Sequence, residues 1–117
     1  MTKATIYHNP RCSKSRNALA ILQEHDIEIK EVRYLETPPN KEELKALCEM
    51  LKVKPFELVR TGEALFKELK LSKQEALSED EWLQILTDNP RLIERPIIQV
   101  GIKAVIGRPP ENVLTLI

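Results

Sequence analysis

The alternation of apolar and polar residues predicts two strands and a helix in the N-terminal third of the chain. The apolar run "ATIY" at 4–7 ends at "HNP", which predicts a buried strand followed by a turn. From Ser15 onward, apolar residues recur on one helical stripe. The segment "IEIKEVRYL" at 27–35 is rich in β-branched residues and predicts a second strand, which "TPPN" at 37–40 ends.

The middle of the chain predicts a block of helices. Asn40 and Glu43 form a capping-box pattern before a stripe of apolar residues, Leu44, Leu47, Cys48 and Leu51. Proline in the first turn of "PFELVR" at 55–60 favours another helix, and "EALFKEL" at 63–69 predicts a short one. Ser78 and Glu81 form a second capping box, whose helix stops at Pro90.

The C-terminal segment predicts two strands and a helix. "PIIQV" at 96–100 and "IKAVIG" at 102–107 are joined tightly at Gly101, as in an antiparallel hairpin, and "PPENVLTLI" predicts a final helix. The order βαβ, helices, ββα predicts an α/β fold with a four-stranded mixed sheet, which is the thioredoxin-like arrangement. We expect one domain over 1–117, with a helical insertion at about 37–89.

Composition narrows the function classes. Lysine plus arginine total 18 and aspartate plus glutamate total 18, and a net charge of zero argues against broad capture of nucleic acid. No apolar run approaches the roughly 20 residues that span a bilayer. "MTKATIYHNP" lacks the apolar core of a secretion signal, so we expect a cytoplasmic protein with no membrane or nucleic-acid partner. Two cysteines and two histidines, widely spaced, predict no disulfide framework and no metal site.

Cys12 stands at the predicted junction between the first strand and the first helix. Unpaired N–H groups of a helix N-terminus can stabilise a thiolate and can also bind an oxyanion. Neighbouring residues add cations and hydroxyl donors: His8, Arg11, Lys14 and Arg16, with Ser13 and Ser15. The pattern favours an activated thiolate in an anion-binding loop over its alternative, a structural cysteine in a tight turn.

Ser15 stands where a dithiol enzyme of C-x-x-C type would carry its second cysteine. A serine cannot resolve a mixed disulfide. Cys48 lies on an apolar helical stripe and is interpreted as a core residue. If so, Cys12 must be regenerated by a thiol from outside the chain.

Three arginines lie at predicted junctions between elements: Arg60 after "PFELV", Arg95 in "IERPII" and Arg108 in "IGRPP". Junction loops carry much of the function of α/β proteins, and a guanidinium fork suits an oxyanion. Taken alone, each arginine is better interpreted as a solvated surface residue, and only a family pattern groups the three.

Several separated motifs in a fixed order resemble the glutaredoxin-coupled arsenate reductases, over essentially the whole chain. They are "IYHNPRCSKSR", "YLETPPNKEEL", "LVRTGE", "RLIERPII" and "GRPPENVL". The resemblance implies that Cys12 is the nucleophile and that Arg60, Arg95 and Arg108 hold the arsenate oxygens. It also implies that His8 and Ser15 help to lower the thiol pKa and that Pro96 follows a cis peptide bond. The chain is shorter than the best-studied branch of the family.

The implied activity is reduction of arsenate to arsenite through a Cys12 thiol–arsenate intermediate. Glutathione would be the co-substrate and glutaredoxin the partner, with no bound cofactor. Two alternatives stay open: a glutathione-dependent thiol reductase of another substrate, and a non-enzymatic stress regulator of the same fold that binds RNA polymerase. Such regulators usually carry C-x-x-C as a redox switch, and Ser15 argues against that mechanism here.

Overall fold

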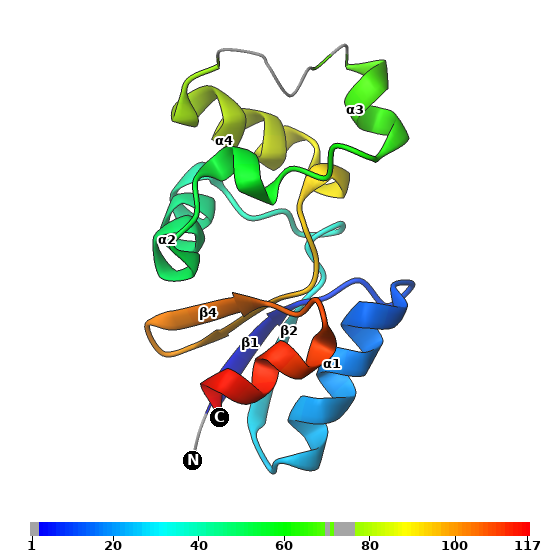
Figure 1. The fold of residues 1–117 in the computed structure, drawn as a ribbon, viewed down its shortest axis with the longest axis vertical. Coiled ribbons are helices and arrows are strands. Elements are labelled where there is room, and N and C mark those ends of the chain that lie inside the picture. Colours follow the sequence, from blue (N-terminus) through cyan, green and yellow to red (C-terminus); the bar gives the residue numbers. More distant parts are fainter. Residues whose placement is uncertain (1–2, 70, 72–76) are drawn as a thin grey trace. The chain divides into compact units, whose positions relative to one another are not determined.

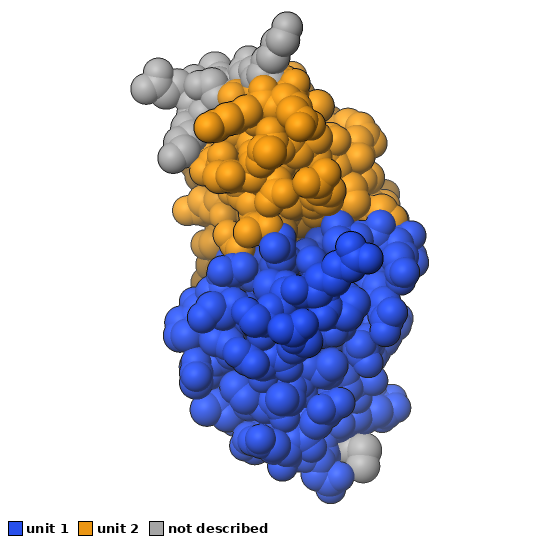
Figure 2. All heavy atoms as spheres, turned by 90° about the vertical axis from the view of Figure 1, so that its right-hand side faces the viewer, with its two compact units in different colours: residues 1–37, 95–117 blue, residues 38–94 orange. Residues whose placement is uncertain are grey.

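The chain folds into two compact units, which Figure 2 colours separately. The computed structural model describes residues 3–69, 71 and 77–117. Unit 1 comprises residues 1–37 and 95–117, and unit 2 comprises residues 38–94. The helical insertion expected at about 37–89 lies almost entirely within unit 2, which extends to residue 94. A single domain over 1–117 stays a prediction. Within the described residues, no helix has the length and apolar character needed to cross a bilayer.

Unit 1 contains a four-stranded mixed sheet, as the sequence predicted. The strands are β1 (Lys3–Tyr7), β2 (Glu28–Val32), β3 (Ile97–Val100) and β4 (Lys103–Ile106), in the spatial order β2-β1-β3-β4. β1 and β2 run parallel, and helix α1 (Ser13–Glu24) connects them. β3 is antiparallel to both β1 and β4. Figure 1 shows the C-terminal strand pair beside the N-terminal strands. The βαβ segment at the start of the chain and the ββα segment at its end therefore form one thioredoxin-like sheet.

The core of unit 1 lies between the sheet and two helical segments. α1 and the 3-10 helix η3 (Pro110–Leu116) pack side by side, and η3 is the red segment next to α1 in Figure 1. The buried core residues come from the strands, α1 and η3: Ala4, Ile6, Ala18, Leu22, Ile98 and Val113. Because side chains alternate along a strand, β1 presents Ala4 and Ile6 to the same face. This packing holds the N-terminus of α1 at the carboxyl end of β1.

Two elements of unit 1 differ from the sequence predictions. The second strand ends at Val32, not at 35, because the amides of Glu36 and Thr37 both donate to the Arg33 carbonyl and close a turn. The final helix is a 3-10 helix, whose i to i+3 pattern includes the Asn112 amide bond to the Pro109 carbonyl. Gly101, with φ +61°, occupies the tight turn between β3 and β4, where its positive φ is permitted without strain.

Unit 2 is built from short helices with one isolated β-bridge. The α-helices are α2 (Lys41–Leu51), α3 (Ala64–Glu68) and α4 (Glu79–Asp88), and the 3-10 helices are η1 (Pro55–Leu58) and η2 (Pro90–Leu92). The bridge pairs Val59 with Ile93. The segment 55–60, predicted as a helix, forms only the single 3-10 turn η1, and Arg60 lies after it, outside any helix or strand.

Both predicted capping boxes are present in unit 2. The Glu43 amide donates to the Asn40 side chain at 2.8 Å, and the Glu81 amide donates to Ser78 Oγ at 3.2 Å. Each glutamate in turn accepts from the backbone N–H of its capping residue. Such caps satisfy amides that have no partner within the helix, which explains why α2 and α4 begin where the sequence indicated.

Candidate active site around Cys12

Cys12 occupies the N-cap position of α1, directly before the first helical residue, Ser13. Its carbonyl accepts the first intrahelical hydrogen bond, from the Arg16 amide at 3.0 Å. The residue is 8% exposed, and its thiol makes no completed capping hydrogen bond. The sulfur therefore lies among the unpaired amides and the positive end of the helix dipole.

The surroundings of Cys12 lower the pKa of its thiol. Burial by itself raises the pKa, but the backbone N–H groups of Ser15 and Lys14 and the guanidinium of Arg95 outweigh it. These groups are hydrogen-bond donors or cations, so they favour the thiolate over the thiol. The structure thus places a thiol with a lowered pKa at the position where the sequence predicts an activated one.

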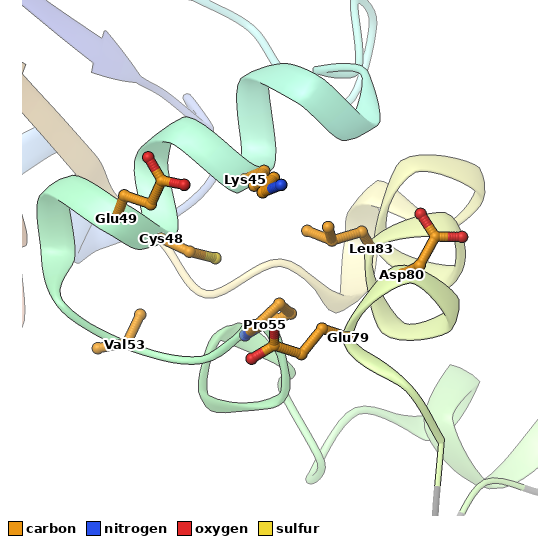
Figure 3. A pocket seen from close by; sticks show the side chains of 8 residues that line it. All are labelled: Lys45, Cys48, Glu49, Val53, Pro55, Glu79, Asp80 and Leu83. Atoms are coloured by element: carbon orange, nitrogen blue, oxygen red, sulfur yellow. The ribbon is translucent and has the colours of Figure 1, made fainter.

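Cys48 lies in unit 2, in a different environment. It projects from α2 toward a pocket of about 320 Å³ that Pro55, Leu83 and Glu79 help to line (Figure 3). Burial, together with the charges of Glu79, Glu57 and Glu49, raises the pKa of the Cys48 thiol to about 11. Both cysteines are unpaired thiols. Cys48 is therefore buried, as expected of a core residue, and its raised pKa keeps the thiol protonated at neutral pH.

The opposite pKa shifts predict selective alkylation of Cys12. Since the thiolate is the reactive form, iodoacetamide should modify Cys12 at neutral pH at least about tenfold faster than Cys48. The Cys12 rate should level off at a lower pH than that of an ordinary thiol, since its pKa is lowered. Peptide mapping of the labelled protein across a pH series measures both rates. In urea the two cysteines should react alike, and equal rates in the folded protein would contradict the assignment.

Ser15 stabilises the loop that leads into Cys12. Its hydroxyl oxygen accepts a hydrogen bond from the Asn9 amide at 3.0 Å and lies 2.7 Å from His8 Nδ1. The residue is fully buried. These contacts connect the loop before Cys12 to helix α1, which begins after it. Ser15 acts on the thiol through its backbone N–H, while its hydroxyl holds the loop.

His8 is held in the neutral form at neutral pH. Burial lowers its pKa, and the charges of Arg33 and Arg16 lower it further against the opposing effect of Glu31. The Glu31 carboxylate lies 3.9 Å from His8 Nε2, which favours a proton on that nitrogen. The Ser15 hydroxyl then donates to Nδ1. A neutral His8 contributes to the loop's architecture and adds no positive charge next to the thiol.

Replacing Ser15 by alanine should destabilise the fold. The change leaves the buried Asn9 amide and His8 without their shared partner, at a cost of about 1–3 kcal/mol in the free energy of unfolding. Urea denaturation measures the difference. Ser13→Ala is the matched control, because Ser13 lies in the same helical turn and is exposed. Equal stabilities of the two variants would contradict the supporting role.

Arg95 and Arg108 both belong to unit 1 and act around the Cys12 sulfur. Arg108 Nη2 lies 4.0 Å from Sγ, at the outer limit of a hydrogen bond to sulfur. The Nε–H of Arg108 donates to the Arg95 carbonyl at 2.7 Å, which fixes the direction of the fork. Arg95 lowers the Cys12 pKa through both its charge and its side-chain hydrogen bond. The guanidinium groups of Arg95 and Arg108 thus both act on the Cys12 sulfur, and groups of this kind can also bind oxyanions.

The backbone around these arginines is shaped by close contacts. The Arg95–Pro96 peptide bond is cis, as expected at Pro96, and Arg108–Pro109 is cis as well. The Gly107 amide donates to the Pro96 carbonyl at 2.8 Å. A Cβ at Gly107 would meet Pro96 Cγ at 2.7 Å, so this position needs glycine. The Asn112 side chain donates to the Arg108 carbonyl and ties the loop to η3.

Arg60, the third predicted site arginine, belongs to unit 2. Its guanidinium pairs with Glu63 at 3.1 Å and with Glu94 at 3.7 Å. Its amide donates to the Leu92 carbonyl at 2.7 Å, next to the Val59–Ile93 bridge. These contacts fix both the side chain and the backbone of Arg60 within unit 2. Its expected role toward an oxyanion stays a prediction.

Tyr34 and Asn9 are site residues to which sequence reasoning assigned no role. Tyr34 is buried, and burial raises its pKa to about 12 against the lowering influence of Arg95 and Asn9. The charge of Cys12 also acts on Tyr34, which places its hydroxyl in the same electrostatic cluster. Tyr34 lies within the quoted motif "YLETPPNKEEL", but a tyrosine after a strand gives no distinctive signal. Among the described residues, no group of three metal-ligating side chains is positioned to hold a metal ion.

Known proteins of similar sequence and structure identify the family of this chain. A family model described as the ArsC family matches residues 7–116. The uncharacterised protein YfgD of Escherichia coli K12 is 49% identical over 119 residues, which cover 100% of this chain and 99% of YfgD. An arsenate reductase of Neisseria meningitidis is 43% identical over 114 residues, which cover 97% of each chain. The solved structure of an arsenate reductase from Vibrio cholerae superposes with a TM-score of 0.92 at 43% identity, covering 99% of this chain and 98% of its own.

Near full-length similarity in both sequence and fold, together with the motif order, leads to one conclusion: the chain belongs to the ArsC family and shares its fold with arsenate reductases.

Proposed function

We propose that the protein is an arsenate reductase that uses glutathione and glutaredoxin as its source of electrons. The observation that carries the proposal is the Cys12 thiol itself, with its lowered pKa, at the N-terminus of α1 and beside Arg95 and Arg108. Arsenate is a tetrahedral oxyanion, and helix amides with guanidinium forks bind such anions. The arsenate reductases of similar sequence support this choice of anion.

The first step would be attack of the Cys12 thiolate on arsenic(V). A sulfur–arsenic bond forms while an oxygen leaves as hydroxide or, after protonation, as water. The guanidinium groups of Arg95 and Arg108 would offset the charge that shifts among the oxygens, as donors in an oxyanion hole do. Arg60 is expected to hold an arsenate oxygen in the same step, so Arg60→Ala should slow arsenate-dependent NADPH oxidation.

The later steps would need thiols from outside the chain. Glutathione attacks arsenic and forms a second sulfur–arsenic bond, while another arsenic-bound oxygen is protonated and leaves as water. The glutaredoxin thiolate then attacks the sulfur of that glutathione. A disulfide forms, and the electron pair of the broken sulfur–arsenic bond stays on arsenic, which becomes arsenic(III). Hydrolysis releases arsenite and returns the Cys12 thiol. This scheme requires no bound cofactor and is compatible with a cytoplasmic setting, where glutathione keeps thiols reduced.

A coupled assay tests the proposal. Purified protein, glutathione, glutaredoxin and glutathione reductase should oxidise NADPH only when arsenate is added, and arsenite should appear in step with it. Cys48→Ser should change the rate less than about twofold, because its protonated thiol has no part in the scheme. Absence of arsenate-dependent oxidation would refute the proposal. Disulfide reduction without arsenate activity would favour a thiol reductase, and capture of RNA polymerase would favour a regulator.

A further inference from the structure

A second feature of unit 1 lies against the loop that leads into Cys12. A pocket of about 270 Å³ is lined by the loop segment 8–11 and, across from it, by Arg33, Leu35 and Glu36. All these residues belong to unit 1. The Cys12 amide donates to the Asn9 carbonyl at 2.9 Å, so a wall of the pocket and the nucleophile are parts of one turn.

The charges of this pocket suit an anion from solution. The side chains of Arg11 and Arg33 are exposed, and neither forms a salt bridge with a carboxylate of the described residues. The backbone on both sides is fixed: the Arg11 amide donates to Asn9 Oδ1 at 3.0 Å, and the Arg33 carbonyl accepts from two turn amides. Two guanidinium groups on fixed backbones, without a salt bridge to any carboxylate that the structure describes, form a site for carboxylates.

The chemistry proposed for Cys12 requires a thiol molecule from solution to bind near it. The two thiols of the chain are Cys12 and Cys48, and Cys48 is buried among the α2 and α4 side chains of unit 2. Ser15, at the position of a resolving cysteine, is fully buried in the loop support. Electrons must therefore reach Cys12 from a separate thiol molecule that binds close to its loop.

We propose that the pocket lined by Arg11 and Arg33 is the subsite for the external reductant, an anionic peptide thiol whose carboxylates these two arginines bind. The inference rests on the proposed function only for the identity of that thiol. A glutathione-like tripeptide carries two carboxylates, one ammonium group and a central thiol. Glu36 offers a partner for the ammonium group, and Leu35 offers an apolar contact for the backbone between them.

Thiol–disulfide exchange tests this subsite without arsenate. The Cys12 thiolate attacks one sulfur of glutathione disulfide, the disulfide bond breaks, glutathione thiolate leaves, and a Cys12–glutathione mixed disulfide forms. Intact-mass spectrometry of the Cys48→Ala protein follows its formation. Each protein is also tested with bis(2-hydroxyethyl) disulfide, a neutral reagent that reports the reactivity of Cys12 alone. The variants are Arg33→Gln and Arg11→Gln, and the matched control is Lys30→Gln, an exposed cation three residues before Arg33 on β2.

With glutathione disulfide, Arg33→Gln and Arg11→Gln should each react about tenfold more slowly, the effect of losing one charge-assisted contact. With the neutral disulfide they should stay within about twofold of the parent protein. Lys30→Gln should stay within that range with both reagents. The proposed subsite would be overturned if the arginine variants lost equal rate with both reagents or lost no rate with either. An equal loss of rate in Lys30→Gln would also overturn it.

The arsenate assay separates this inference from the proposed function. If the coupled reaction works, the KM for glutathione should rise about tenfold in Arg33→Gln while the KM for arsenate stays within about twofold. An unchanged KM for glutathione would overturn the subsite and leave arsenate reduction intact. If the parent protein reduces no arsenate, the proposed function fails, and the exchange rates still decide the subsite.

Discussion

Cys12→Ser is expected to abolish arsenate-dependent turnover while the protein stays folded. A serine hydroxyl remains protonated under conditions where the Cys12 thiol, with its lowered pKa, is ionised. Loss of the nucleophile removes the covalent route altogether, so the coupled rate should fall at least about 10³-fold. NADPH oxidation and arsenite formation measure the loss.

The position of Cys12 makes the same substitution harmless to stability. It occupies the N-cap of α1 without a completed capping hydrogen bond, and serine is one of the best N-cap residues. The free energy of unfolding should therefore be unchanged or rise by up to about 1 kcal/mol. Urea denaturation separates loss of chemistry from loss of fold. Turnover close to the parent rate in folded Cys12→Ser would refute the role of Cys12 as nucleophile.

The fold could be predicted from the sequence because the local patterns that indicate its strands and helices are all consistent with the same fold. The buried strand at Lys3–Tyr7, the stripe of α1 and the two capping boxes each indicated one element. A parallel crossover followed by a hairpin leaves few ways to form one sheet, and the observed order β2-β1-β3-β4 is one of them.

The ends of elements were less predictable, because tertiary contacts decide them. The strand that stops at Val32 stops because of turn bonds to the Arg33 carbonyl. The helix predicted from Pro109 onward is a 3-10 helix. Short apolar spacings in "ENVLTLI" do not distinguish the two helix types, and Pro110 supplies no amide for the first turn.

The candidate site was predictable where a residue type carries its own chemistry. A cysteine before a helix and arginines at junctions indicated an anion site, and the structure brings Arg95 and Arg108 to Cys12 within unit 1. The detailed roles were not predictable. Whether Ser15 acts through its amide or its hydroxyl depends on the buried contacts with His8 and Asn9. The raised pKa of Tyr34 comes mainly from burial, with a further contribution from the charge of Cys12.

Arg95→Ala and Arg108→Ala should both slow arsenate reduction, but for reasons that can be told apart. Each removes a guanidinium group from the oxyanion site, which should lower kcat/KM for arsenate by about 10²-fold. Arg95 also lowers the pKa of the Cys12 thiol through its charge and hydrogen bond, whereas the contact of Arg108 with the sulfur is long, at 4.0 Å, and its side chain is exposed. Solvent screens the charge of Arg108, so its share in activating the thiol is small.

Alkylation without arsenate reveals this difference. The pH at which Cys12 becomes reactive should move upward in Arg95→Ala, because the thiolate loses a stabilising cation and donor. In Arg108→Ala the same midpoint should stay close to that of the parent protein. Arg91→Ala is the matched control, because Arg91 is an exposed arginine of unit 2 that pairs with Glu63, and neither measurement should change. If Arg95→Ala left the alkylation profile unchanged and Arg108→Ala shifted it, the roles of the two arginines would be reversed. If neither variant lowered kcat/KM, Arg95 and Arg108 would have no part in holding the oxyanion, and the α1 amides and Arg60 would be left as its binding groups.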